Sequence, residues 1–170
     1  YFSSEKFLFI VRDVFNTVEF VKQSAKSLGI IDFEMFILKE ETRGQAETVY
    51  LAIEHSNYVG SITIFNIDTF RPNFSFPDLE CIVDGYLEVF KGEGDNWSFV
   101  KPINTKSTQI IETSEKRPIS DLCCTGLYHF SDISLFKESF DDYLMKPEIE
   151  WEKGELYVAP LYNYLIKNNS

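Results

Sequence analysis

The chain has 170 residues, which is the length of a single domain. Hydrophobic residues make up 44% of it, enough to build one buried core, and this argues against a disordered chain. The formal net charge is −11, and so acidic a surface repels nucleic acid and anionic membranes. A small phosphorylated ligand stays compatible with this charge, because it needs only a few local cations, a metal ion and backbone N–H groups.

The cysteines and histidines argue against several other classes of protein. The chain has an odd number of cysteines, of which two are adjacent: Cys81, Cys123 and Cys124. This arrangement matches neither a disulfide framework nor a CxxC zinc site. This usage indicates a reducing compartment and predicts a cytoplasmic protein. His55 and His129 have no metal-ligand spacing, and no signature of a serine or cysteine nucleophile is present. No apolar run is long enough to span a bilayer.

The first part of the chain alternates strand and helix patterns. The apolar run 6–12 predicts a buried strand, and apolar residues at helical spacing follow from 14 to 25. A second strand is expected at 33–39, a second helix begins at Gly44, and a third strand is expected at 61–67. Two successive strand–helix–strand units predict a parallel sheet with right-handed crossovers.

The later part of the chain predicts more strands and two helices. Strands are expected at 82–90, 97–103, 108–114 and 123–130. The segment 91–96 is rich in Gly and Asn, which is typical of a hairpin connection. A helix at 133–144 is expected to be capped by Ser131 or Asp132, and Pro160 suits the first turn of a last helix. The prediction is one α/β domain whose mostly parallel sheet carries added antiparallel strands.

Two polar segments follow predicted strands, at the edge where open α/β sheets bind ligands. Gly44-Gln45-Ala46 begins a predicted helix. A glycine at this position lets a ligand approach the backbone closely, and the first N–H groups of a helix are free to donate hydrogen bonds. The Gln45 side chain could form a hydrogen bond with the edge of a base. Asn66 and Asp68 close the third strand, and a carboxylate at a strand tip is suited to Mg²⁺. Taken alone, each pattern is more often an ordinary helix start or a local Asp turn.

Glu115-Lys116 is the third candidate. A carboxylate accepts hydrogen bonds from sugar hydroxyls, and an adjacent lysine pairs with a phosphate. The alternative interpretation is a solvated charged turn, which is the usual meaning of such a run.

The order of these segments is more specific than any one of them. The series is Gly44-Gln45-Ala46-Glu47-Thr48, Asn66-Ile67-Asp68, Asp84-Gly85-Tyr86, Trp97-Ser98-Phe99-Val100, Glu115-Lys116 and Thr125-Gly126-Leu127-Tyr128. It resembles the sugar-phosphate nucleotidyltransferases, which include glucose-1-phosphate thymidylyltransferases, and especially the bacterial branch associated with capsule and surface-polysaccharide genes. The resemblance covers nearly the whole chain. It implies a Rossmann-like nucleotide-diphospho-sugar transferase fold in one domain, residues 1–170, that is incomplete at its N-terminus.

The resemblance also implies an Mg²⁺-dependent reaction between a nucleoside triphosphate and a sugar 1-phosphate, which attacks the α-phosphorus and releases pyrophosphate. The implied substrate-binding residues are Gly44, Gln45 and Ala46 in the nucleobase pocket, Asn66 beside it, Glu115 on sugar hydroxyls and Gly126 next to the sugar. The implied catalytic residues are Asp68, which holds the metal, and Lys116, which binds the sugar phosphate. The strand around 97–100 would form part of the sugar-side wall. The nucleobase, the sugar and a homo-oligomeric state stay open.

Two features of the family are not matched. Its first strand leads into a Gly-rich loop with an arginine that wraps the triphosphate, and nothing in Tyr1 to Arg12 corresponds. Its second metal-binding aspartate has no counterpart, since Asp141 and Asp142 lie on a predicted helix. We therefore expect a fragment with little activity of its own. A glycosyltransferase on a related fold and a non-catalytic nucleotide-sugar-binding domain are the alternatives.

Overall fold

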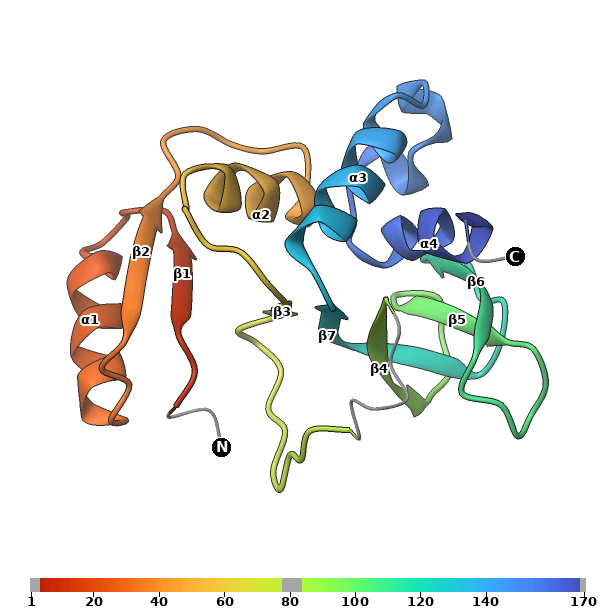
Figure 1. Ribbon diagram of the computed structural model, residues 1–170, viewed down its shortest axis with the longest axis horizontal. Helices are drawn as coiled ribbons and strands as arrows, with labels where there is room; N and C mark the ends of the chain where they lie inside the picture. Colours follow the sequence, from red (N-terminus) through yellow and green to blue (C-terminus); the bar gives the residue numbers. More distant parts are fainter. Residues whose placement is uncertain (1–3, 78–83, 169–170) are drawn as a thin grey trace.

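The computed structural model describes residues 4–77 and 84–168, which form two β-sheets with helices packed around them (Figure 1). The strands are β1 (Phe7–Val11), β2 (Phe33–Ile37), β3 (Ile62–Phe65), β4 (Gly85–Lys91), β5 (Ser98–Pro102), β6 (Ile110–Glu115) and β7 (Leu122–Phe130). The helices are α1 (Thr17–Ser27), α2 (Gln45–Glu54), α3 (Ile133–Leu144) and α4 (Tyr162–Asn168), with short 3₁₀ turns η2 (Glu148–Glu150), η3 (Glu152–Gly154) and η4 (Ala159–Leu161). The predicted α/β class is confirmed.

The N-terminal sheet contains only β1 and β2, which run parallel and are joined by α1. This first crossover unit is confirmed. The prediction that its first strand is buried is wrong, because all five residues of β1 are only partly covered. One edge of β1 pairs with β2, and no described strand pairs with the other edge. Ala25 is the only fully buried residue among 4–44.

The second sheet is built around the long strand β7. Tyr128 has cross-strand partners on both β3 and β4, and Cys123 has partners on both β4 and β5. Because β4 runs along one edge of β7, β3 and β5 share the other edge. β3 ends opposite Leu127 and β5 pairs at Cys123, so residues 124–126 lie between the ends of two strands.

The strand pairing differs from the predicted mostly parallel sheet. All described pairs in the second sheet are antiparallel, since β3 joins β7 instead of β1 or β2. The hairpin prediction for 91–96 is also wrong, because β4 and β5 lie on opposite edges of β7 and do not pair with each other. Residues 82 and 83 of the predicted fourth strand lie outside the described residues.

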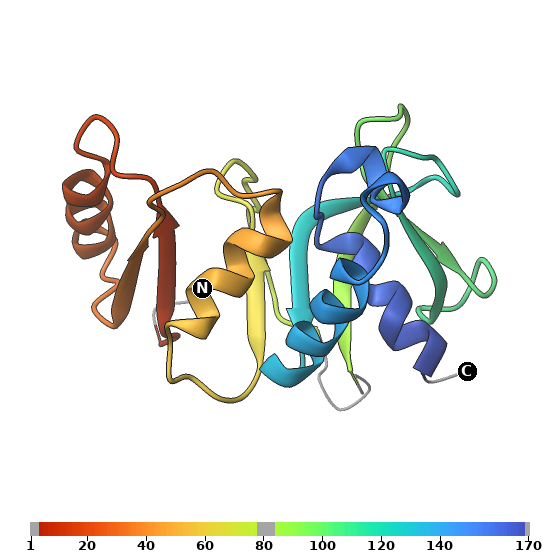
Figure 2. The ribbon, with the colours of Figure 1, turned by 90° about the horizontal axis from the view of Figure 1, so that it is seen from above.

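The core lies between the second sheet and helices α3 and α4, while α2 contacts β1 on one side and α3 on the other (Figures 1 and 2). Asp132 caps α3 by accepting the N–H of Ser134 at 2.8 Å, which confirms one of the two predicted caps. Phe136 and Phe140 on α3 are buried, and Tyr50 of α2 stacks on Phe140 with ring centroids 4.4 Å apart. Each buried aromatic of this kind contributes roughly 1.5–3 kcal/mol.

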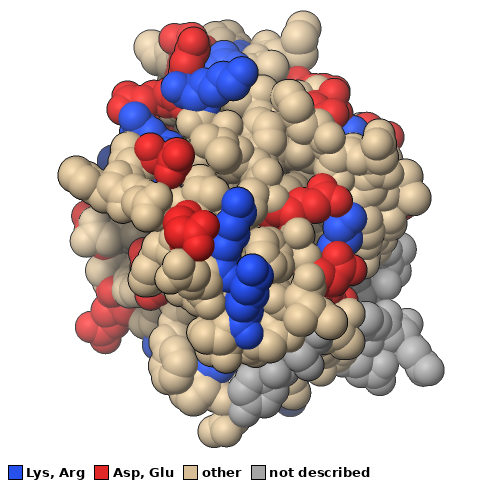
Figure 3. All heavy atoms as spheres, turned by 90° about the vertical axis from the view of Figure 1, so that its left-hand side faces the viewer, with Lys and Arg blue, Asp and Glu red and all other residues tan. Residues whose placement is uncertain are grey.

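The face of the molecule over the N-terminal sheet carries basic and acidic side chains interspersed in a largely uncharged surface (Figure 3). Phe20 and Leu28 of α1 and its C-cap are exposed in this part of the chain. Among the described residues, no helix combines the length and the apolar character that crossing a membrane requires.

Candidate functional site

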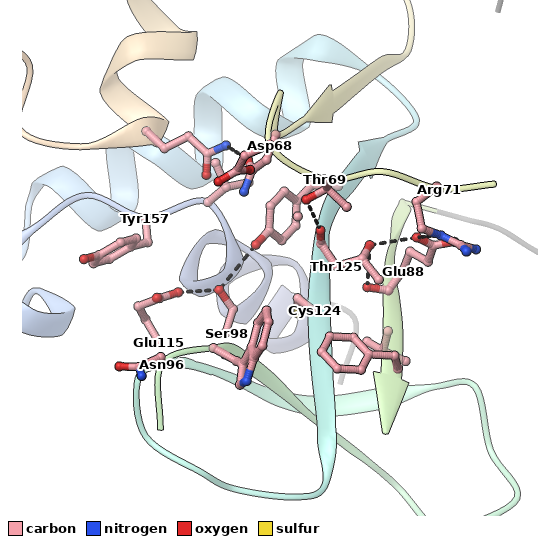
Figure 4. Close-up of a pocket in the computed structure, with 18 of the residues that line it drawn as sticks. Asp68, Thr69, Arg71, Glu88, Asn96, Ser98, Glu115, Cys124, Thr125 and Tyr157 are labelled. Atoms are coloured by element: carbon pink, nitrogen blue, oxygen red, sulfur yellow. Dashed lines mark hydrogen bonds and ion pairs between the residues drawn. The ribbon is translucent and has the colours of Figure 1, made fainter. Parts of the chain in front are cut away.

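A cavity of about 920 Å³ lies where β3 ends and β5 begins along the edge of β7 (Figure 4). Its walls come from the loop after β3, from β4, β5 and the end of β6, from residues 124–126 of β7, and from the segment that follows η3. The break between two strands on a shared edge leaves room that a continuous sheet would fill. The fold therefore creates the cavity at the point where the β7 edge changes partner.

Three predicted site residues form a hydrogen-bonded network along one wall of this cavity. Gln45 at the start of α2 donates its amide N–H to the side-chain oxygen of Asn66, which follows β3. The backbone N–H of Asn66 donates to the carbonyl oxygen of Gly126, at 3.1 Å. A Cβ on Gly126, whose φ is +90°, would lie 2.6 Å from the Asn66 amide nitrogen. Gly126 thus makes room for Asn66, and all three residues line the cavity.

Gly44 and Ala46 have a structural explanation and do not line the cavity. A Cβ on Gly44 would lie 2.5 Å from the carbonyl oxygen of Leu156. The same oxygen accepts the N–H of Ala46 at 2.8 Å, and Ala46 is fully buried. The glycine at this helix start therefore admits a neighbouring stretch of backbone. A contact between Gly44 or Ala46 and a nucleobase stays a prediction.

Asp68 lies in the loop after β3, exposed to solvent and facing the cavity (Figure 4). The loop is fixed beside β7, because the Thr69 hydroxyl donates to the carbonyl oxygen of Thr125 at 2.9 Å. Within residues 4–77 and 84–168, no group of three or more His, Cys, Asp or Glu side chains could hold a metal. A single carboxylate does fit Mg²⁺, which in phosphate sites keeps waters and takes its other ligands from the substrate.

Glu115 is the last residue of β6 and points into the cavity from its opposite side. Only 5% of the residue is exposed. The Ser98 hydroxyl donates a hydrogen bond to the Glu115 carboxylate. Burial raises the pKa of this carboxyl, against the opposing effects of the Ser98 hydrogen bond and the positive charge of Lys116. A buried carboxylate with few partners of its own is suited to accept hydrogen bonds from a ligand.

Lys116 follows with a left-handed backbone, φ +52°, which is uncommon for a residue with a side chain. Its N–H donates to the carbonyl oxygen of Trp97 at 2.8 Å. Its ammonium group lies 2.6 Å from the hydroxyl of Tyr157, and Tyr157 lines the cavity. Asp68, Glu115 and Tyr157 therefore line one cavity, although they come from distant parts of the sequence. Lys116 itself is not one of the lining residues and adjoins the cavity only through its contact with Tyr157.

The residues at the far end of the cavity were not foreseen from the sequence. Arg71 contacts both carboxylate oxygens of Glu88, with its Nε 2.9 and 2.8 Å from them, and Thr125 donates to the same carboxylate at 2.7 Å. The Arg71 hydrogen bonds lower the pKa of the Glu88 carboxyl. β4 has a bulge between Leu87 and Val89, and a bulge re-aims the side chain it carries. The sequence contains no signal for this bulge.

An aromatic wall closes the cavity beside Glu115. Trp97 and Phe90 pack edge to face with ring centroids 5.0 Å apart, and both line the cavity together with Ser98. Phe99 and Val100, which belong to the same predicted wall, are buried in the core instead. The predicted wall at 97–100 is therefore formed by its first two residues and not by its last two.

The two histidines have structural roles, as the sequence indicated. His129 is buried in β7, its Nδ1 lies 2.9 Å from the Thr63 hydroxyl, and its ring stacks on Tyr86. Burial lowers the pKa of His129, which favours the neutral ring. His55 packs its ring against Phe36 at the end of α2. Neither histidine lines the cavity.

Comparison with solved structures shows which family this fold and cavity belong to. A nucleoside-diphosphate-sugar pyrophosphorylase from Vibrio cholerae RC9 is 55% identical, superposes with a TM-score of 0.92, and is matched over 99% of this chain and 71% of its own. The chain therefore belongs to the nucleoside-diphosphate-sugar pyrophosphorylases. No protein-family model and no curated protein sequence matches the chain.

Two more distant structures share the fold. A protein assigned as a glucose-1-phosphate thymidylyltransferase from Bacillus anthracis, solved with sucrose, is 18% identical with a TM-score of 0.67, over 95% of this chain and 63% of its own. A UDP-glucose pyrophosphorylase, solved with UDP-glucose, is 10% identical with a TM-score of 0.56, over 92% of this chain and 63% of its own. At these identities the likeness concerns the fold alone.

Proposed function

We propose that residues 1–170 form the sugar-binding part of an Mg²⁺-dependent sugar-1-phosphate nucleotidyltransferase. In the proposed reaction a sugar 1-phosphate oxygen attacks the α-phosphorus of a nucleoside triphosphate, giving a nucleoside-diphosphate sugar and pyrophosphate. The product would serve surface-polysaccharide synthesis in the cytoplasm, in line with the capsule branch that the motif order resembles.

The observation that carries this proposal is the cavity that Asp68, Glu115 and Tyr157 line together, with Lys116 bonded to the Tyr157 hydroxyl. Its volume, about 920 Å³, lies at the upper end of the range of small-molecule sites, which suits a ligand as large as a nucleotide sugar. The cavity combines an aromatic wall with a buried carboxylate, and a lysine is bonded to the hydroxyl of one lining residue, Tyr157. These are the groups that bind a sugar ring, its hydroxyls and its phosphate.

Each side chain has a proposed task. Glu115 accepts hydrogen bonds from sugar hydroxyls, and because its own site is dry those bonds form at low cost in lost hydration. Lys116 binds the sugar phosphate and orients its attacking oxygen. Asp68 holds Mg²⁺, which when bound neutralises charge on the phosphates. Gln45, fixed by Asn66, presents its free amide oxygen to the base. Positioning and charge neutralisation, without a covalent intermediate, supply the catalysis.

The triphosphate half of the proposed site is not found in residues 1–170. No Gly-rich loop with an arginine is present in Tyr1 to Arg12, and among the residues that the structure describes no second aspartate lines the cavity with Asp68. Donors that stabilise a transition state contribute about 2.7–4 kcal/mol each, so these residues alone should turn over slowly. The alternative is a nucleotide-sugar-binding domain without turnover.

The test is pyrophosphate release by the complete protein. UTP, CTP, GTP, ATP and dTTP are each incubated with a panel of hexose 1-phosphates, with and without Mg²⁺. We expect release with at least one pair, dependent on Mg²⁺ and reduced more than about 100-fold in Asp68→Asn. Asp95→Asn, in an exposed loop outside the cavity, is the matched control and should keep full activity. Binding of a nucleoside-diphosphate sugar without any release would favour the non-catalytic candidate.

A further inference from the structure

The ammonium group of Lys116 is held by a neutral partner. The nitrogen lies 2.6 Å from the Tyr157 hydroxyl and 4.8 Å from the centre of its ring, so the contact is a hydrogen bond to the oxygen more than an approach to the ring face. Lys116 has no carboxylate within salt-bridge distance among the described residues. A carboxylate partner would cancel the charge that a phosphate needs, whereas a hydroxyl fixes the group and leaves the charge in place.

The other charged side chains at the cavity are either acidic or paired, which makes the unpaired charge of Lys116 unusual. Four carboxylates line it: Asp68, Glu88, Glu115 and Glu155. The one arginine among the lining residues, Arg71, is committed to Glu88 through a bidentate ion pair. Lys116 adjoins the cavity through Tyr157 and makes no ion pair within residues 4–77 and 84–168, so its charge is available to an anionic ligand.

Tyr157 is itself rigidly placed. Leu156, the residue before it, is fully buried, and its backbone bonds to Arg43 and Ala46 at the start of α2, both at 2.8 Å. Val158, the residue after it, is 1% exposed. With both neighbours fixed in the core, Tyr157 has little freedom to move. Its hydroxyl accepts a hydrogen bond from Lys116 at 2.6 Å.

The backbone of Lys116 adds a second constraint. Its φ is +52°, a left-handed conformation, and the two neighbouring side chains reach different groups: Glu115 accepts from Ser98, and Lys116 donates to Tyr157. Strain of this kind costs roughly 1–3 kcal/mol and persists where surrounding contacts hold it. The Trp97 carbonyl, which accepts the Lys116 N–H at 2.8 Å, is one such contact.

We propose that Tyr157 is a positioning residue whose hydroxyl aims the Lys116 ammonium group at the phosphate of the sugar substrate. This inference rests on the proposed nucleotidyltransferase function and assigns a task to a residue that the motif order did not single out. It predicts that loss of the hydroxyl alone weakens use of the sugar phosphate and leaves the nucleoside triphosphate unaffected.

The test compares Tyr157→Phe with Tyr58→Phe in the complete protein. Tyr58 is a matched control, because its hydroxyl also makes one hydrogen bond, to Ser61 at 2.9 Å, but lies outside the cavity. We expect Tyr157→Phe to raise KM for the sugar 1-phosphate about tenfold, the effect of one hydrogen bond to a charged group, with KM for the triphosphate within about twofold. In a Lys116→Ala background Tyr157→Phe should have no further effect. Equal changes in both KM values, no change, or additive effects would overturn the inference.

A second measurement decides the inference even if no pyrophosphate is released and the proposed function fails. The Lys116 ammonium signal is followed by NMR in protein labelled with ¹⁵N-lysine, and inorganic phosphate is then added. A hydrogen-bonded ammonium exchanges its protons slowly, so we expect a signal in the native protein and in Tyr58→Phe that is lost in Tyr157→Phe and that shifts when phosphate is added. An unchanged signal in Tyr157→Phe, or one insensitive to phosphate in the native protein, would contradict it.

Discussion

The strands β1 and β7 are both apolar, yet only β7 is buried. All but two residues of β7 are buried, whereas every residue of β1 stays partly covered. β7 pairs along both edges and is covered by α3, while β1 pairs with β2 alone among the described strands. The difference shows that a run of apolar residues predicts a strand, and that the number of neighbours decides how deeply it is buried. Every residue that lines the cavity comes from the better-packed part of the chain.

The largest expected contrast is between two phenylalanines. Phe136→Ala, at a fully buried position of α3, should lower the free energy of unfolding by about 3–5 kcal/mol through lost burial and a cavity. Phe20→Ala, on α1 where the side chain is 69% exposed, should change it by less than about 0.5 kcal/mol. Urea denaturation measures both values. Similar losses in the two variants would show that α1 packs as tightly as α3.

A smaller contrast concerns strained backbone. Lys116, φ +52°, and Asn16, φ +64°, both have left-handed conformations in which a Cβ is unfavourable. Lys116→Gly should be more stable to urea than Lys116→Ala by about 1 kcal/mol, because glycine adopts this conformation freely. The gain from Asn16→Gly over Asn16→Ala should be smaller, since the N-terminal unit contributes few buried contacts to global unfolding. A larger gain at Asn16 would reverse our ranking of the two regions.

The smallest expected effect is a pH dependence at Glu115. Its pKa is raised above the ordinary value of 4.5, so between these two values the folded state binds more protons than the unfolded state. Stability from this group is present below 4.5 and falls as the pH rises through the raised pKa. Glu115→Gln should therefore gain melting temperature relative to the native protein as the pH goes from 4 to 8. A difference in melting temperature that stays constant from pH 4 to pH 8 would contradict this prediction.

Local sequence patterns predicted where helices and strands lie better than they predicted which strands pair with one another. The start of the second helix at Gly44 and the Asp132 cap of α3 followed from the chemistry of a few neighbouring residues, and both are confirmed. The change of partner along β7 depends on segments some 60 residues apart, and no local pattern encodes that register. The hairpin prediction failed for the same reason.

In the candidate site too, local sequence patterns identified some of the residues and missed others. Gln45, Asn66, Asp68, Glu115 and Gly126 were predicted and all line the cavity, while the tasks assigned to them stay proposals. Tyr157 and the Arg71–Glu88 pair were missed, because a tyrosine in an apolar stretch and a scattered ion pair carry no signature of their own. Their importance depends on what the fold brings beside them.

The central claim is that a nucleoside-diphosphate sugar binds in the cavity beside β7, and chemical-shift mapping tests it most directly. The protein, labelled with ¹⁵N, would be titrated with UDP-glucose and related nucleotide sugars. We predict that the largest shifts occur at the backbone amides of Ser98, Lys116, Gly126 and Tyr157, with β1 and α1 unaffected. Shifts confined to residues 4–44, or shifts that persist equally in Glu115→Gln and Lys116→Ala, would contradict the account.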